Sequence, residues 1–439
     1  MLPPSTRGRR PESSKRESRG PERSGTKIFL TASGEEIGVP SGTVRERRGC
    51  KQHGVRTGCL FERYVDLLLN LREGFKQMAL VLHIGDGKCG STAIQHALHE
   101  QRLQLRASGI LFDTGPSRRD HFLLTTLIGR VTRSSGPGQI EYARHNLTSL
   151  VKQAVDYNHV LISSEGLLSA DPKEVLDLLA HTGLDTSDVR AIAYVREPCS
   201  MYPSLIQQQL KGSSKYTAPG DYRRPLDLFV HRWQTTLGVK RVSVRLFDRR
   251  SLLDGDVVKD FSTTLGSMIG DSLPELTGAQ VNTSLSAEQL IILQSLQRKL
   301  PKESQGKFTP DANRLISFFQ SLNSGGMIGN SIKLNEKASS LIASNNMSIV
   351  SNLNKLVPGL GMAIPSVNGS SLQVSKVAWQ GDGSVAEVLL NVNESLVDTL
   401  SLLVNDKNLR PQASQELLRF YVSDISRRNA IVSALQKQG

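Results

Sequence analysis

Short apolar runs that alternate with stretches of helical periodicity constrain the fold of this chain more than any other feature. Four runs have the length and the Val and Ile content of buried parallel strands: ALVLHI (79–84), HVLISS (159–164), VRAIAYV (189–195) and VSVRLF (242–247). Helical periodicity fills stretches near 91–105, 140–157, 172–182, 199–211 and 256–265. The alternation predicts an α/β fold, a doubly wound and mostly parallel sheet flanked by helices.

Composition divides the chain into three predicted parts. Residues 1–77 are rich in Arg, Ser, Pro and Gly, which predicts a disordered, basic extension. Residues 78–269 hold the strand pattern and predict one α/β domain. Residues 270–439 predict a mostly helical region, in which Ser286 and Gln289 have the spacing of a capping box before an apolar helix. Met78 directly precedes the first strand, so a start at Met78 instead of Met1 is an open alternative.

The net charge and the cysteine content indicate which partners and which cellular compartment to expect. The formal net charge of +13 favours an anionic partner, but residues 1–77 carry 16 Lys and Arg against 9 Asp and Glu. Nucleic acid is therefore expected only through this basic arm. The four cysteines are scattered and form no C-x-x-C pair, which argues against a disulfide framework or a zinc site. With no apolar run of membrane-spanning length, we predict a cytoplasmic protein.

A glycine-rich loop, GDGKCGST (85–92), separates the first apolar run from the next helical stretch. Its glycines let the backbone approach an anion, Lys88 adds a positive charge, and a helix beginning near Ser91 offers unpaired N–H groups. The nucleotide-hydrolase pattern G-x-x-x-x-G-K-[ST] has lysine directly after its last glycine, whereas Ser91 follows Gly90 here. We expect the loop to bind a phosphate or sulfate group; an ordinary strand-to-helix turn is the alternative.

A second candidate anion site, REPCSMYPS (196–204), follows the run VRAIAYV. Arg196 lies at the end of the expected strand, and Ser204 lies eight residues later on an expected helix. A guanidinium fork and a hydroxyl are suited to holding a phosphomonoester. The alternative is a surface arginine that pairs with Glu197 or another carboxylate.

Together the two stretches resemble the nucleotide-binding signatures of the sulfotransferases that use 3′-phosphoadenosine 5′-phosphosulfate (PAPS). The resemblance covers roughly residues 79–266. In that family the first loop, typically P-K-x-G-[ST]-[ST], holds the 5′-phosphosulfate, and an Arg and a Ser of the second signature hold the 3′-phosphate. The first role falls here on Lys88, Gly90, Ser91 and Thr92, and the second on Arg196 and Ser204.

The resemblance implies a P-loop-like sulfotransferase fold, with residues 78–269 as the nucleotide-binding domain. It implies a bacterial-type enzyme that transfers a sulfuryl group from PAPS to a hydroxyl of a carbohydrate or a cell-envelope metabolite. The product nucleotide would be adenosine 3′,5′-bisphosphate, and no metal is expected. Asp86 and Gly87 stand where the family usually has Pro or a similar residue, and Cys89 where it often has Thr. A carboxylate beside an anion loop disfavours binding unless it points away.

Sulfuryl transfer needs a base for the acceptor hydroxyl and a cation for the departing bridging oxygen. The second task falls to Lys88. For the first, Glu165 in LISSEGL ends a predicted strand, where carbohydrate-acting members of the family are similar in carrying a catalytic glutamate. His121 in RRDHFLL is the competing base. The alternatives are a helix-capping role for Glu165 and a structural role for His121.

Further cations and two other functional classes remain open. Lys211, Lys215, Arg223 and Arg224 lie in a Gly-, Ser- and Pro-rich stretch, LKGSSKYTAPGDYRR, where they would contact an anionic acceptor or the nucleotide; the alternative is ordinary solvated charge. A P-loop kinase is the catalytic alternative, although it would need a lysine after Gly90. The other is a non-catalytic nucleotide- or polyanion-binding protein.

Overall fold

The computed structural model describes residues 78–405, except 117, 123, 130–136, 272, 279–283, 302–305, 324–326 and 364–382. The predictions made for residues 1–77 and for the end of the chain after 405 concern residues outside this part. In the described ranges, no helix has the length and apolar character needed to cross a membrane.

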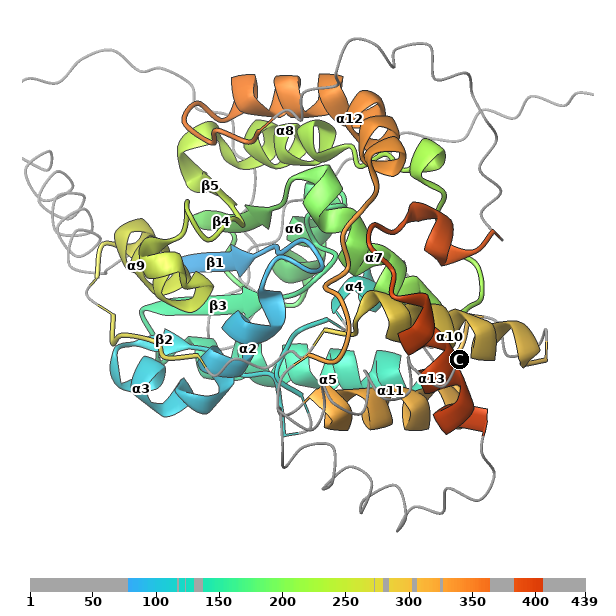
Figure 1. Cartoon of the computed structure of the whole chain (residues 1–439). Coiled ribbons are helices and arrows are strands. Elements are labelled where there is room, and N and C mark those ends of the chain that lie inside the picture. The colour runs from blue at the N-terminus through green and yellow to red at the C-terminus, as the bar shows by residue number, and fades with distance from the viewer. Residues whose placement is uncertain are drawn as a thin grey trace, which may run out of the picture. The chain divides into compact units, whose positions relative to one another are not determined.

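The core of the fold is a parallel sheet of five strands in the order β2-β3-β1-β4-β5 (Figure 1). The strands are β1 (Ala79–His83), β2 (Ile110–Leu111), β3 (His159–Ser163), β4 (Val189–Val195) and β5 (Val242–Leu246). Four of them are the apolar runs of the sequence, so the α/β class and the parallel sheet are confirmed. With β1 in the centre, its carboxyl end lies between those of β3 and β4.

Strand register explains why the apolar runs are nearly continuous. Leu82 of β1 lies opposite Ile162 of β3 and Ala191 of β4. Successive side chains point to opposite faces, so Leu80 and Leu82 join one hydrophobic cluster and Val81 joins the other. Both faces of β1, β3 and β4 are buried, which is why these strands do not alternate with polar residues, whereas the edge strand β5 alternates Val with Ser and Arg.

Helices cover both faces of the sheet (Figure 1). The helices that precede or follow the strands are α2 (Ser91–Glu100), α3 (Arg102–Ala107), α4 (Leu124–Leu127), α5 (Pro137–Ala154), α6 (Pro172–His181), α7 (Pro198–Gly212), α8 (Leu226–Leu237) and α9 (Val257–Ile269). One face packs against α5, α6 and α8, and the other against α2, α3 and α9.

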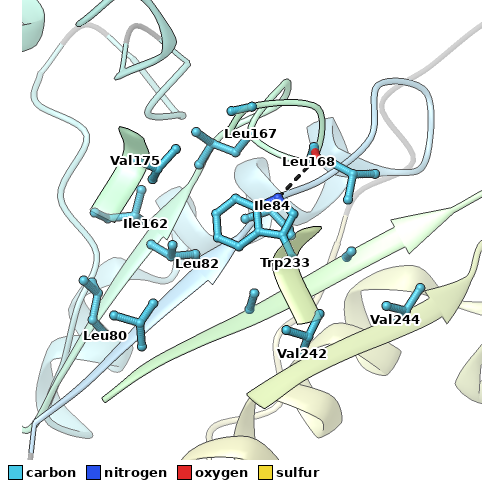
Figure 2. Close-up of a cluster of buried hydrophobic side chains, with 14 of the residues drawn as sticks. Leu80, Leu82, Ile84, Ile162, Leu167, Leu168, Val175, Trp233, Val242 and Val244 are labelled. Carbon is cyan, nitrogen blue, oxygen red and sulfur yellow. Dashed lines mark hydrogen bonds between the residues drawn. The ribbon is translucent and has the colours of Figure 1, made fainter. Parts of the chain in front are cut away.

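Trp233 anchors α8 to the sheet. Its side chain is fully buried and lies with Leu82 and Ile84 in one hydrophobic cluster, and its indole N–H donates to the carbonyl of Leu168 at 3.2 Å (Figure 2). A buried indole needs such an acceptor, because an unpaired N–H in a core is costly.

The described elements differ from the predicted ones at three points. The helix expected near 91–105 is two helices, α2 and α3, separated at Gln101. Strand β2 has only two residues, too few for a periodic signal. Helix α8 was not predicted, although it contains the buried Trp233.

Four α-helices of the described ranges follow the sheet region along the chain, of which the first three contact α7 and the last contacts α10. They are α10 (Ala287–Lys299), α11 (Pro310–Leu322), α12 (Glu336–Leu356) and α13 (Glu394–Asn405). Helix α12 lies beside α8, and its Val350 shares the core cluster of the sheet (Figure 1). The capping box that starts α10 is confirmed: the Ser286 hydroxyl accepts from Gln289 N–H at 3.2 Å, and Gln289 Oε1 accepts from Ser286 N–H at 3.0 Å.

Buried glutamines on α10 hold the last turn of α7 and the stretch that follows it. Gln297 Nε2 donates to the carbonyl of Lys211 at 2.7 Å, and Gln294 Nε2 donates to that of Ser214 at 3.0 Å. The α10 helix therefore fixes the backbone of a loop in which the sequence placed substrate-binding cations.

Candidate anion-binding site

Two segments predicted to bind anions meet at the carboxyl edge of the sheet. The Lys88 loop (residues 85–92) follows β1, and the Arg196 segment (residues 196–204) follows β4, its neighbour. Arg196 Nη1 donates to the Lys88 carbonyl and to the Ser204 hydroxyl, both at 3.4 Å, and Arg196 Nε donates to Ser200 Oγ at 3.1 Å. One guanidinium thus joins the two segments, which lie 108 residues apart in the sequence.

The Lys88 loop has a backbone conformation that depends on glycine. Lys88 and Gly90 have positive φ values of 64° and 81°. A Cβ atom on Gly90 would lie 2.8 Å from Phe247 Cε2 and 2.9 Å from Val257 Cγ1, both too close. Gly90 is therefore required by its φ and by the side chains that pack against it.

The amino terminus of α2 faces this loop without a side-chain cap. Gly90 occupies the N-cap position, so the first N–H groups of the helix, at Ser91 and Thr92, have no intrahelical acceptor. The Ser91 hydroxyl is buried and donates to the Asp86 carbonyl at 3.1 Å, whereas the Thr92 side chain is exposed. Ser91 is thus placed to offer an anion its N–H rather than its hydroxyl.

Positive side chains gather beside the loop. Lys88 is exposed, and its Nζ donates to Gln208 Oε1 on α7 at 3.0 Å. Lys211 follows Gln208 by three residues on the same helix; burial, and then the nearby Lys88 charge, lower the pKa of Lys211. Together with Arg196, these two lysines give this edge a positive potential.

Arg224 neutralises Asp86, the acidic residue of the Lys88 loop that departs from the sulfotransferase pattern. The Asp86 side chain is buried, and Arg224 Nε donates to its Oδ2 at 2.7 Å while Nη2 contacts Oδ1. Asn346 of α12 accepts from the backbone N–H of Arg224 at 2.9 Å. Arg224 thus binds this carboxylate, while Lys215 and Arg223 of the same stretch are exposed.

Neighbours of Arg196 leave its charge available. The Glu197 carboxylate accepts from the N–H groups of Cys199 at 2.8 Å and Ser200 at 2.7 Å, so it caps α7 instead of pairing with Arg196. The Arg196 guanidinium carbon lies 5.6 Å from the centre of the Phe247 ring, which orients it further.

Glu165 lies two residues beyond the end of β3, near the Lys88 loop. A Cβ atom on Gly87 would lie 3.9 Å from Glu165 Oε2. Burial, with a smaller effect of the Asp120 charge, raises the pKa of the Glu165 carboxyl, although Lys88 and the Ser91 hydroxyl oppose the shift. Asp171, and not Glu165, caps the next helix, α6. Glu165 is therefore a partly buried carboxyl group beside a lysine.

His121 is held by backbone groups on both ring nitrogens. Its Nδ1 accepts from the N–H of Ser163 at 3.2 Å, and its Nε2 lies 2.9 Å from the Asp113 carbonyl. This pattern corresponds to the neutral tautomer protonated on Nε2, and burial lowers the pKa of His121. Neither nitrogen is free to accept a proton from a ligand.

The two cysteines that fall in these segments differ in their surroundings. Cys89 is fully buried among apolar side chains, and burial raises the pKa of its thiol to about 12. Cys199 lies beside Ser339, with Sγ 3.5 Å from the Ser339 carbonyl, and burial also raises the pKa of the Cys199 thiol. Neither thiol is therefore activated as a nucleophile.

A cavity of about 520 Å³ adjoins the Arg196 segment. Arg196, Ser200 and Ser204 line one wall, and the opposite wall comes from the C-terminal region, including Met327 and Lys333. A larger cavity of about 720 Å³ lies at β5 and α9 and contains none of the predicted residues. Its Arg190 and Arg245 already bind Asp188 and Asp260, so we consider the smaller cavity the better candidate.

Three residues of this site were missed from the sequence. Gln208 follows Ser204 by four residues, and this helical spacing was a signal that could have found it. Phe247 and Lys333 gave no such signal, because only packing brings their segments to the Arg196 segment.

Comparisons with known proteins do not assign a function to this site. No family model, no curated protein and no solved structure matches the chain. In the described part of the chain, no three His, Cys, Asp or Glu side chains are grouped to hold a metal ion. The α/β fold and the geometry of the site are therefore the evidence on which a function rests.

Proposed function

We propose that this protein is a sulfotransferase that uses PAPS and modifies a hydroxyl of a carbohydrate or a cell-envelope metabolite. The observation that carries the proposal is the double contact of Arg196 with the Lys88 carbonyl and the Ser204 hydroxyl. It brings the two segments that resemble the donor signatures to one edge of the sheet. A positively charged edge at the carboxyl ends of parallel strands suits a doubly phosphorylated nucleotide.

The donor would lie across both segments. Arg196 and Ser204 would hold its 3′-phosphate, and Lys88 with the N–H groups at the start of α2 would hold its 5′-phosphosulfate. The 520 Å³ cavity beside Arg196 has the size of a nucleoside site, and its wall at Met327 and Lys333 gives the C-terminal region a part in binding.

The transfer follows from the charges that surround the Lys88 loop. The acceptor oxygen forms a new bond to sulfur while the bond from sulfur to the bridging oxygen breaks. Glu165 takes the acceptor proton, and Lys88 stabilises the charge that grows on the bridging oxygen. The raised pKa of Glu165 brings its basicity closer to neutral pH, where a general base is most effective.

Isothermal titration of adenosine 3′,5′-bisphosphate into the full chain tests the donor site, with ATP as the competitor. We expect micromolar binding that Lys88→Ala and Arg196→Ala each weaken ten-fold or more, about 1.4 kcal/mol, with ATP much weaker. ATP binding tighter than the bisphosphate would favour a kinase. A folded sample that binds no bisphosphate would refute the donor assignment.

A further inference from the structure

A second basic cavity, of about 430 Å³, lies at the carboxyl end of β2. It is bounded by the junction of α2 and α3, by the loop after β2 and by α5. His99 and Arg102 line it from the helix junction, His145 lines it from α5, and Arg106 and Asp113 lie between them. Two guanidinium groups and two imidazoles thus line one cavity with one carboxylate.

That single carboxylate is already bound. Asp113 Oδ2 accepts from Arg106 at 3.2 Å and from Gln153 at 2.7 Å, and Asp113 Oδ1 accepts from the N–H of Gly115 at 2.9 Å. Arg102, by contrast, donates to the carbonyl of His99 at 2.8 Å and forms no ion pair within the described ranges. The exposed Arg102 side chain therefore brings to this cavity a positive charge that is paired with no carboxylate of the described ranges.

The cavity lies on the same edge of the sheet as Glu165. Thr114 and Asn146 line both it and a smaller hollow that is bordered by Asp120 and His121. The carboxyl end of β2 adjoins that of β3, and Glu165 follows β3 by two residues. Asn146 donates to the Thr114 carbonyl at 2.9 Å, which fixes the wall that the two hollows share.

We propose that this cavity binds an acidic group, a carboxylate or a sulfate ester, on the acceptor sugar, with Arg102, His99 and His145 as its contacts. The inference rests on the proposed function, because the cavity lies beside the end of β3, from which Glu165 would act on the acceptor. An oxyanion would supply the negative partner that the Arg102 guanidinium lacks within the described ranges. A guanidinium is suited to bind an oxyanion through two hydrogen bonds.

Histidine NMR on the full chain tests the proposal, because the chain has only nine histidines. D-glucuronate and D-glucose 6-sulfate are titrated into protein labelled at histidine Cε1, with D-glucose as the neutral control. His99→Gln and His145→Gln assign the two resonances. We expect at least one acidic sugar to shift both resonances with a saturable curve, and glucose to shift neither.

Arg102→Gln should weaken that binding at least five-fold. The matched control is Arg119→Gln, which removes an exposed arginine that lies 3.9 Å from Glu100 and outside the cavity. Equal shifts with glucose, no shift with either acidic sugar, or unchanged binding in Arg102→Gln would each overturn the proposal. Bisphosphate titration of the same samples distinguishes failure of this proposal from failure of the proposed function. Loss of bisphosphate binding with the acidic sugar still bound would refute the donor site, and bisphosphate binding without sugar binding would refute the acidic-sugar site.

Discussion

Arg224 binds the carboxylate of Asp86 across 138 residues of sequence, with 2.7 Å between Arg224 Nε and Asp86 Oδ2. Asp86 is the residue that argued most strongly against an anion site in the Lys88 loop. Because its charge is compensated inside the protein, the charges that reach the loop surface are those of Lys88 and Arg196.

Removing one partner of this pair should destabilise the protein strongly. Asp86→Ala leaves the Arg224 guanidinium partly buried without its carboxylate, and we expect the free energy of unfolding to fall by about 2–3 kcal/mol. Urea denaturation measures this change. In a double-mutant cycle with Arg224→Met, the second substitution should cost little once the first is present. Additive effects of the two would mean that the pair contributes no coupling.

Gly90→Ala should disrupt the Lys88 loop. A positive φ costs an L-residue about 1–2 kcal/mol, and the new Cβ would overlap Phe247 and Val257. We expect at least about 2 kcal/mol less stability, together with weaker bisphosphate binding. Gly220→Ala is the control, because a Cβ there meets no atom within 4 Å and should change stability by less than about 0.5 kcal/mol. Equal stabilities of the two variants would contradict this account of the loop.

Arg196→Lys keeps the positive charge but loses the guanidinium, whose Nη1 reaches Lys88 and Ser204 and whose Nε reaches Ser200. We expect adenosine 3′,5′-bisphosphate to bind about ten-fold more weakly, a loss of about 1.4 kcal/mol. Arg250→Lys is the matched control, since Arg250 pairs with Asp248 on the surface. Titration calorimetry measures both. Full affinity in Arg196→Lys would show that charge alone matters at this position.

Glu165 should make stability depend on pH in a defined direction. Burial raises its folded-state pKa above the unfolded value of 4.5, so the folded protein binds this proton more tightly. The stability from that proton is complete below pH 4.5 and is lost as the pH rises through the folded pKa. Glu165→Gln has no proton to lose at this position. The difference in unfolding free energy between Glu165→Gln and the parent should therefore shift in favour of the variant from about pH 4 to pH 7.

Urea unfolding at several pH values measures the difference. Glu141→Gln, an exposed glutamate on α5, is the control and should follow the parent throughout. A constant difference between Glu165→Gln and the parent at every pH would mean that the Glu165 pKa is not raised.

His121→Gln distinguishes a structural histidine from a catalytic one. Its ring contacts both Ser163 and Asp113, and losing two hydrogen bonds should cost about 2 kcal/mol of stability. We expect bisphosphate affinity to stay within two-fold of the parent. A variant of unchanged stability that binds donor but transfers no sulfuryl group would make His121 the base instead of Glu165.

Local sequence patterns were enough to predict most of the sheet. The strands β1, β3 and β4 are buried on both faces, so each had to be an apolar run, and such runs are visible without a structure. In β5, Val242 and Val244 pack on one face while Ser243 and Arg245 line a cavity on the other, and this alternation is also visible in the sequence. The capping box at Ser286 was visible for the same reason, since its hydrogen bonds join residues three apart. Strand β2 was not predicted, because two residues are too few to show a hydrophobic period.

The residues of the candidate site likewise divide into those that could be chosen from the sequence and those that could not. Lys88, Gly90 and Arg196 could be chosen from the sequence, because each belongs to a short motif whose chemistry depends on neighbouring residues. The partners of Asp86 and Lys88, which are Arg224 and Gln208, could not be paired with them, since they lie 138 and 120 residues away.

Hydrophobic periodicity and loop chemistry are properties of adjacent residues, so they were enough to predict the parallel sheet and to select the two segments expected to bind anions. The tertiary structure sets which charges remain available. It paired Asp86 with Arg224 and left Arg102 without a carboxylate within the described ranges. The physical reason is that charge compensation depends on distance in space, and only the packing of helices from distant parts of the chain sets those distances.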